Sequence, residues 1–359
     1  MLTLVVPTRN RVHFLSRFLN YYADRGFSHP ILIADASDPE PYETLERIIW
    51  RHRHRLQVTH LLYPGEDAGV CLAHGFKQVR TPYALFAADD DFYVPAALDR
   101  CVSFLERSPD YRVAHGICIK FKIDTGRAHG QFLWASHYDY FDIEDESGCA
   151  RLGHFLGRRY ASGNSVHRTE DIRDAYEWAV ELKLDVFFLE FLTSCIPVIR
   201  GKVKRMEKLF RLWQVHPAQS SVRVPLDPFS WVGTKYWADH YNRFKRCLAE
   251  ELARQDGVPV WEGEEVVKKY TWLFLSNMFN HDWNIAYAPH RLNGFRAGLK
   301  DSFRRALGRL KAGNRLFSFI PTSSMDLSLE DLLHPSSVYH EDFMPIYQAV
   351  SRSVEEPVA

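Results

Sequence analysis

Several features that the sequence lacks limit the class of protein it can belong to, before any motif is considered. No stretch of about 20 apolar residues occurs, the length that a helix needs to cross a bilayer. The longest apolar run, Val186 to Ile199, is shorter and contains Glu190. The 45 basic residues balance the 45 acidic ones, so no net positive field attracts nucleic acid. We therefore expect no transmembrane helix and no nucleic-acid partner.

Paired cysteines are also missing. The six cysteines are widely spaced, no CxxC pair occurs, and no signal peptide is recognisable. Disulfide frameworks belong to secreted proteins, whereas scattered cysteines are typical of reduced, buried thiols. These features favour a cytoplasmic protein.

The length and the periodicity suggest a large α/β domain followed by helices. A chain of 359 residues suffices for one large or two modest domains. Pro197 to Val203 reads as a strand and turn. From about Ser230, apolar residues recur at helical spacing. We expect a domain over 1–225, with halves at 1–110 and 111–225, and a mainly helical C-terminal extension over 226–359.

The most informative stretch is a short apolar strand, Tyr83 to Ala88, that runs into Asp89, Asp90 and Asp91. A strand that is apolar throughout is typical of a parallel sheet covered on both faces. Three adjacent carboxylates repel one another, and a hard divalent cation such as Mn2+ or Mg2+ relieves that repulsion. The cluster predicts a metal that holds phosphates. The alternative is a solvated acidic turn before a helix that begins near Pro95.

Strands and helices alternate ahead of this cluster. The expected strands cover 2–7, 30–37, 56–63 and 83–88, and the expected helices cover 14–22, 42–53 and 68–79. This order predicts parallel strands with right-handed crossovers and helices on both faces. Ligands bind beyond the carboxyl ends of such strands, here at Pro7, Thr8, Asp35 and the three aspartates.

Four of these segments, in this order, resemble family-2-type glycosyltransferases with the GT-A fold, of the kind that build bacterial cell-surface polysaccharides. They are Leu4 to Arg11, Ile33 to Ser37, Gly69 to Phe76, and the strand that ends in the aspartates. The resemblance implies a Rossmann-like, mostly parallel sheet and a metal-dependent, inverting transfer of sugar. The donor would be a nucleotide sugar, and the acceptor a saccharide, a lipid-linked saccharide or another hydroxyl. The family commonly has two acids after the second strand, whereas only Asp35 is present here.

The resemblance also assigns residues to the site. For the nucleotide sugar it implies Pro7, Thr8, Arg9, Arg11, Asp35, Gly69, Asp89 and Asp90, and for the metal it implies Asp91, Asp89 and His216. Plain structural roles stay open: a solvated turn for Arg9 and Arg11, a helix cap or a turn acid for Asp35, and a core or surface position for His216.

An inverting transfer needs one base that takes the proton of the acceptor hydroxyl. The segment Glu181 to Leu192 resembles the family segment in which an acid at a helix start does so. Asp185 is the first candidate, and the alternative is that it only caps the helix. Glu190 is the second, five residues further on and about 140° around the helix.

Two further segments have open interpretations. Trp134, Tyr138, Tyr140 and Phe141 form either a stacking surface for a sugar or part of the core, and burial is the commoner fate of large aromatics. The segment 291–315 combines an apolar face with many basic residues and only Asp301 as an acid. It fits peripheral contact with the inner face of a membrane as well as it fits packing on the domain.

Other functions fit less well. A sugar-phosphate nucleotidyltransferase usually has a Gly-rich loop after its first strand, and Pro7 to Arg11 contains no glycine. A haloacid-type phosphatase has its DxD at the first strand, followed by Gly-Thr. A non-catalytic relative that only binds nucleotide sugars stays open.

Overall fold

In the computed structural model, the described parts of the chain are residues 1–158, 162–217, 228–287 and 327–352. The basic segment 291–315 therefore lies outside the described residues, and its two interpretations stay predictions.

The first part of the chain forms a parallel α/β unit, as predicted. Its strands lie in the order β3-β2-β1-β4 and are all parallel. The strands are β1 (Leu2–Thr8), β2 (Ile31–Asp35), β3 (Val58–Leu62) and β4 (Tyr83–Phe86), and the helices between them are α1 (Val12–Asp24), α2 (Pro39–His52) and α3 (Ala68–Gln78). Thr8 lies in register with Asp35, so the polar residues that end β1 and β2 share one edge of the sheet.

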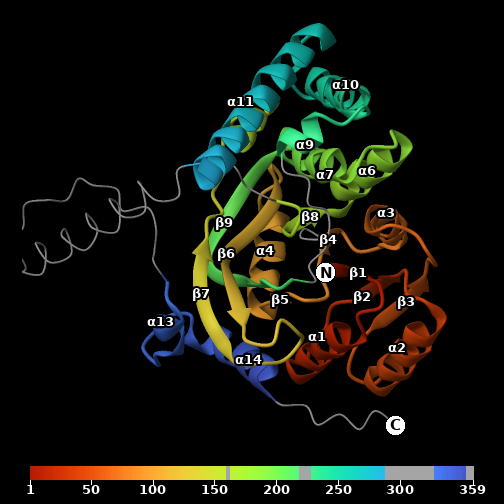
Figure 1. Ribbon diagram of the computed structural model, residues 1–359, viewed down its shortest axis with the longest axis vertical. Coiled ribbons are helices and arrows are strands. Elements are labelled where there is room, and N and C mark those ends of the chain that lie inside the picture. The colour runs from red at the N-terminus through yellow and green to blue at the C-terminus, as the bar shows by residue number, and fades with distance from the viewer. Residues whose placement is uncertain (159–161, 218–227, 288–326, 353–359) are drawn as a thin grey trace, which may run out of the picture.

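The second part extends the same sheet with mixed strand directions. After β4 the order continues β8-β6-β9-β5, and β7 pairs with β6 off this path. The strands are β5 (Phe92–Tyr93), β6 (Tyr111–Ile123), β7 (Phe132–Tyr138), β8 (Val166–Arg168) and β9 (Lys202–Gln214); the helices are α4 (Pro95–Arg107), α5 (Gly148–Gly157), α6 (Thr169–Glu181) and α7 (Val186–Arg200). Because β5 directly follows the aspartates and pairs with β9, the acidic cluster lies between the two parts (Figure 1).

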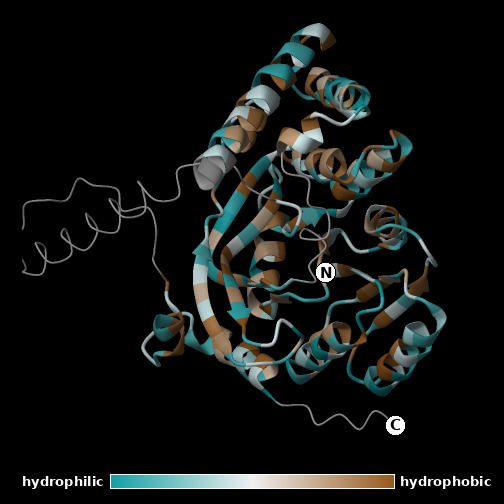
Figure 2. Ribbon diagram, viewed as in Figure 1, coloured by the Kyte–Doolittle hydropathy of each residue, from teal (hydrophilic) through white to brown (hydrophobic). Residues whose placement is uncertain are grey.

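Helices cover both faces of the sheet along most of its length. One core packs α1 and α4 against residues such as Leu4, Ile119 and Leu212. Another packs α5 and α7 against residues of the opposite face, including Val113 and Val203. The helices around the sheet carry both hydrophilic and hydrophobic residues (Figure 2). The predicted class, a GT-A-like mostly parallel sheet flanked by helices, is confirmed.

One expected strand begins later than its sequence suggests. The segment Pro197 to Val203 reads as a strand and turn, but Pro197 lies inside α7 and the strand starts at Lys202. The prediction is wrong because tertiary burial overrides local preference: the last turns of α7 are buried. A proline this near the end of a helix removes only one backbone hydrogen bond.

The C-terminal extension is helical, as predicted, and it packs on the sheet domain. The helices are α9 (Pro228–Val232), α10 (Trp237–Asp256), α11 (Val260–Tyr287), α13 (Leu329–Leu333) and α14 (His340–Ser351). Helices α10 and α11 join the core of α5 and α7, whereas α14 lies against α1 (Figure 1). Within the described ranges, no helix combines the length and apolar character needed to cross a bilayer. The boundary at residue 225 stays a prediction.

The contact between α5 and α11 provides a test of this packing. A Cβ added at Gly153 would overlap the ring of Tyr270, so we expect Gly153→Ala to destabilise the protein by about 1–3 kcal/mol. Gly157→Ala is the matched control, because its nearest neighbour, a methyl of Leu273, is 4.0 Å away. Urea denaturation of both variants measures the difference. Equal free energies of unfolding for the two variants would show that α11 does not pack tightly against α5 at Gly153.

Candidate active site

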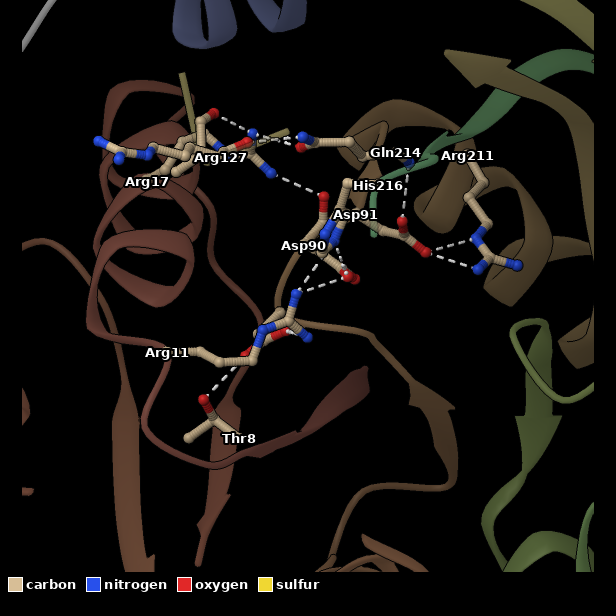
Figure 3. A network of polar contacts seen from close by, with 11 residues as sticks. Thr8, Arg11, Arg17, Asp90, Asp91, Arg127, Arg211, Gln214 and His216 are labelled. Atoms are coloured by element: carbon tan, nitrogen blue, oxygen red, sulfur yellow. Dashed lines mark hydrogen bonds and ion pairs between the residues drawn. The ribbon is translucent and has the colours of Figure 1, made fainter. Parts of the chain in front are cut away.

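The carboxyl ends of β1 and β4 bring Thr8 and Arg11 to the acidic cluster (Figure 3). The hydroxyl of Thr8 donates to Asp89 Oδ2 at 2.8 Å. The guanidinium of Arg11 lies 2.7 Å from Asp89 Oδ1 through Nη1 and 2.7 Å from Asp90 Oδ2 through Nη2. Arg11 thus bridges two of the three aspartates from the turn after β1.

His216 reaches the same place from the segment after β9. Its Nε2 lies 2.8 Å from Asp90 Oδ2 and 3.2 Å from Arg11 Nη2, and its ring stacks on Phe14. The side chain is buried. The structure thus places His216 at the acidic cluster, as expected of the third predicted ligand.

Asp91 points into the sheet. Its Oδ2 accepts from Arg211 Nε at 2.9 Å and from Arg211 Nη2 at 2.5 Å. Its Oδ1 accepts from the backbone N–H of Gln214 at 3.1 Å. Arg211 also donates to the hydroxyl of Tyr140 at 3.1 Å. Both carboxylate oxygens of Asp91 therefore have partners on β9 (Figure 3).

Arg17 supports the cluster from α1, a role that sequence reasoning missed. Its Nη2 donates to the carbonyl of Asp90 at 2.7 Å, and its Nη1 donates to Gln214 Oε1 at 2.7 Å and to the carbonyl of Ala128. The available signal was an arginine among the apolar residues of the buried helix face, next to Phe18. A charge is almost never fully buried without partners.

Burial sets the protonation of the cluster. It raises the pKa of Asp89 to about 7 and that of Asp91 to about 6, although the charges of Arg11 and Arg211 act in the opposite direction. Burial also opposes ionisation of Asp90, but its hydrogen bond to His216 and the charge of Arg11 hold its pKa below the usual range. Asp90 is thus the most firmly ionised of the three.

A divalent cation would compete with Arg11 for its place. Carboxylate oxygens of Asp89 and Asp90 and a ring nitrogen of His216 make a donor set of the type that Mn2+ accepts. The Arg11 guanidinium contacts all three. As these side chains lie, no three His, Cys, Asp or Glu residues of the described ranges form a group able to hold a metal. In this structure Arg11, rather than a metal, holds these three side chains together.

The other predicted nucleotide contacts lie along the same sheet edge. Asp35 is fully buried; its Oδ1 accepts from the N–H of Ser37 at 2.8 Å and its Oδ2 lies 2.9 Å from His60 Nε2. Pro7 is half-buried in β1, and the following Arg9 is exposed. The structural role left open for Asp35 is present, because it orders the turn after β2.

Gly69, in the first turn of α3, packs against Leu189 of α7. A Cβ there would lie 2.5 Å from Cδ1 of Leu189, so only glycine fits this contact without a shift. Leu189 precedes Glu190 in α7. The first turn of α3 therefore lies beside the part of α7 that carries the second candidate base.

Asp185 is the N-cap of α7, which is the alternative role considered for it. Its Oδ1 accepts from the backbone N–H groups of Phe187 and Phe188 at 2.9 and 3.0 Å. Its Oδ2 accepts from Trp231 Nε1 at 3.2 Å and lies 3.1 Å from His240 Nδ1. These four contacts occupy the carboxylate.

Glu190 differs from Asp185 in its hydrogen bonding and in its exposure to solvent. No helix N–H is bonded to it, and its side chain is accessible to solvent. Desolvation by the surrounding protein nevertheless raises the pKa of its carboxyl, while the charge of Arg211 lowers it. Arg211 also holds Asp91, so the same guanidinium acts on the carboxyl of Glu190 and on the acidic cluster.

Comparison with known proteins supports the fold. No family model and no curated protein sequence matches this chain. Among solved structures, S. aureus TarS 1-349 in complex with UDP-GlcNAc is similar, with a TM-score of 0.54 and 14% identity over 80% of this chain and 76% of that one. A crystal structure of TarS has a TM-score of 0.48 and 13% identity over 75% of this chain, which spans only 42% of that longer one. At such identity, the first likeness concerns the fold alone, and it agrees with the GT-A-like class.

The capping role of Asp185 predicts a stability effect. We expect Asp185→Ala to lower the free energy of unfolding by about 1–2 kcal/mol, because it leaves backbone donors of α7 without their acceptor. Glu181→Ala, an exposed change at the end of α6, is the control. Urea denaturation followed by circular dichroism measures both. A stability equal to that of the wild type would remove the capping role.

Proposed function

We propose that the protein is a glycosyltransferase that takes its sugar from a nucleotide-sugar donor. The observation that carries this proposal is the meeting of Thr8, Arg11, Asp89 and Asp90 at one edge of a GT-A-like sheet, with Asp35 on the neighbouring strand. The structural neighbour with the same fold was crystallised with UDP-GlcNAc, so UDP is the first nucleotide to consider. A nucleotidyltransferase is less favoured because Arg9, Asn10 and Arg11 replace a Gly-rich phosphate loop.

The donor end of the site needs positive charge, since a nucleoside diphosphate leaves as an anion. Arg11 supplies a guanidinium that is only partly buried. The predicted divalent cation remains part of this proposal, with one change of ligand. Asp89, Asp90 and His216 would hold it after Arg11 has released them, whereas the predicted ligand Asp91 is held by Arg211 and Gln214. When bound, such an ion neutralises the charge of the leaving diphosphate.

We assign the base to Glu190 in preference to Asp185. In a single displacement with inversion, the acceptor oxygen attacks the anomeric carbon, the bond to the diphosphate breaks, and the acceptor proton passes to a carboxylate. Asp185 already accepts hydrogen bonds at both of its oxygens, whereas Glu190 is accessible to solvent. A raised pKa makes a carboxylate a stronger base.

Nucleotide binding tests the donor half of the proposal. We expect UDP to raise the melting temperature by several degrees when present at about 100 times its dissociation constant, because it binds only the folded state. GDP, CDP and dTDP serve as comparisons, and each is measured with Mn2+ and with EDTA. A shift only with Mn2+ supports the metal, and an equal shift in EDTA assigns its role to Arg11. If no diphosphate shifts the transition, the protein does not use such a donor.

The base assignment predicts a separation of binding from transfer. We expect Glu190→Gln to retain the UDP-dependent melting shift and to reduce donor turnover by about 100-fold or more, the usual contribution of a general base. Release of UDP from UDP-sugars in the presence of an acceptor measures turnover. Asp185→Asn is the paired variant. Near-normal turnover in the Glu190→Gln protein, with loss in the Asp185→Asn protein, would return the base to Asp185.

A further inference from the structure

A patch of aromatic and basic side chains continues from the acidic cluster along the sheet. We call it the ledge and define it as five residues of β6, β7 and β9: Lys120, Lys122, Trp134, Tyr138 and Trp213. In the strand register, Lys120 lies opposite Trp213, Lys122 opposite Trp134, and Cys118 opposite both Tyr138 and Arg211. Side chains at paired and alternate positions share a face, so all five project from the face that carries Arg211.

The opposite face of these strands is ordinary core. Ile119, Phe121 and Leu212 are fully buried there. On the ledge, by contrast, Lys122 is exposed, Trp134 is 38% exposed, and Lys120, Tyr138 and Trp213 are half-buried. Tyr138 and Trp213 pack partly against the core of α5 and α7 and keep part of their surface accessible.

The ledge has a defined geometry. The rings of Tyr138 and Trp213 stand almost perpendicular, with centroids 5.4 Å apart. The ammonium of Lys120 lies 4.2 Å from the centroid of Tyr138 and 4.4 Å from that of Trp213. Cation–π contact holds the lysine in place, so its positive charge lies between the two aromatic rings.

The ledge joins the proposed active site without a break. The guanidinium of Arg211 lies 5.0 Å from the centroid of the Trp213 ring, and the same guanidinium holds Asp91. A molecule bound beside the acidic cluster can therefore extend over Trp213 toward Lys120.

We propose that the ledge binds the acceptor, and that this acceptor is a saccharide carrying acidic groups, either phosphate or carboxylate. The apolar face of a sugar ring packs on an aromatic ring, and Lys120 and Lys122 pair with the acidic groups. This inference rests on the proposed function, because it assigns the second substrate of the same site. It predicts that the site prefers an acidic saccharide to a neutral one.

Binding of defined oligosaccharides to the full chain with UDP present tests the proposal. The probes are oligogalacturonate, phosphorylated maltohexaose and neutral maltohexaose, all six sugars long, measured by calorimetry in about 0.1 M salt. We expect at least one acidic probe to bind about tenfold more tightly than the neutral one, since two exposed ion pairs contribute about this factor. The two acidic probes distinguish carboxylate from phosphate.

Two ledge variants separate charge from stacking. We expect Lys120→Met/Lys122→Met to abolish the preference for acidic probes, and Trp134→Ala to weaken all probes several-fold. The control is Lys268→Met/Lys269→Met, two exposed lysines of α11, which should preserve the preference. The ledge proposal is overturned if no probe binds, if neutral and acidic probes bind equally, if the preference survives in the ledge variant, or if the control also loses it.

The UDP melting shift of the same proteins distinguishes the two proposals. We expect both ledge variants to keep that shift, because the nucleotide contacts lie on β1 and β2. If UDP does not shift the melting temperature of the wild type, the donor proposal fails. If UDP shifts it normally but one of the overturning ledge outcomes occurs, only the acceptor assignment fails.

Discussion

Three consecutive carboxylates at the end of a buried strand are the constraint on which this structure depends. An ion that leaves water for a protein interior loses several kcal/mol of hydration unless a partner replaces it. Arg11 and Arg17 come from the turn and helix after β1, and Arg211 comes from β9, about 120 residues after the cluster. The chain must therefore bring its first 20 residues and its last long strand to the same point. This requirement joins the parallel unit to the mixed one.

The same constraint divides the aspartates by task. Asp91 is tied to Arg211 and Gln214 and fastens β5 to β9. Asp89 and Asp90 face Arg11, the least buried of the three arginines, at the sheet edge where ligands bind. The carboxylate that stabilises the fold therefore directly follows the two that can meet a ligand. Their roles differ because successive side chains point in different directions.

Helix α7 repeats this division with its two acids. Asp185 begins the helix and satisfies its first N–H groups, and Glu190, more than one turn later, is left accessible to solvent. The C-terminal helices stabilise this arrangement, since Trp231 and His240 complete the contacts of Asp185. The helical extension therefore supports the start of α7, although none of its described residues bonds to the acidic cluster.

The sequence by itself determined the order of strands and helices up to α4, the edge at which polar residues gather, and the position of the acidic cluster. Those features follow from local periodicity and from strand ends, which are written in consecutive residues. Only the tertiary structure decided the partners: that Arg11 faces Asp89 and Asp90, that Arg17 and Arg211 are buried cations, and that Asp185 caps a helix. It also decided that α7 continues through Pro197 and that Tyr138 and Trp213 enclose Lys120. Such contacts join residues many positions apart, and no local pattern records which of several possible partners the folded chain brings within reach.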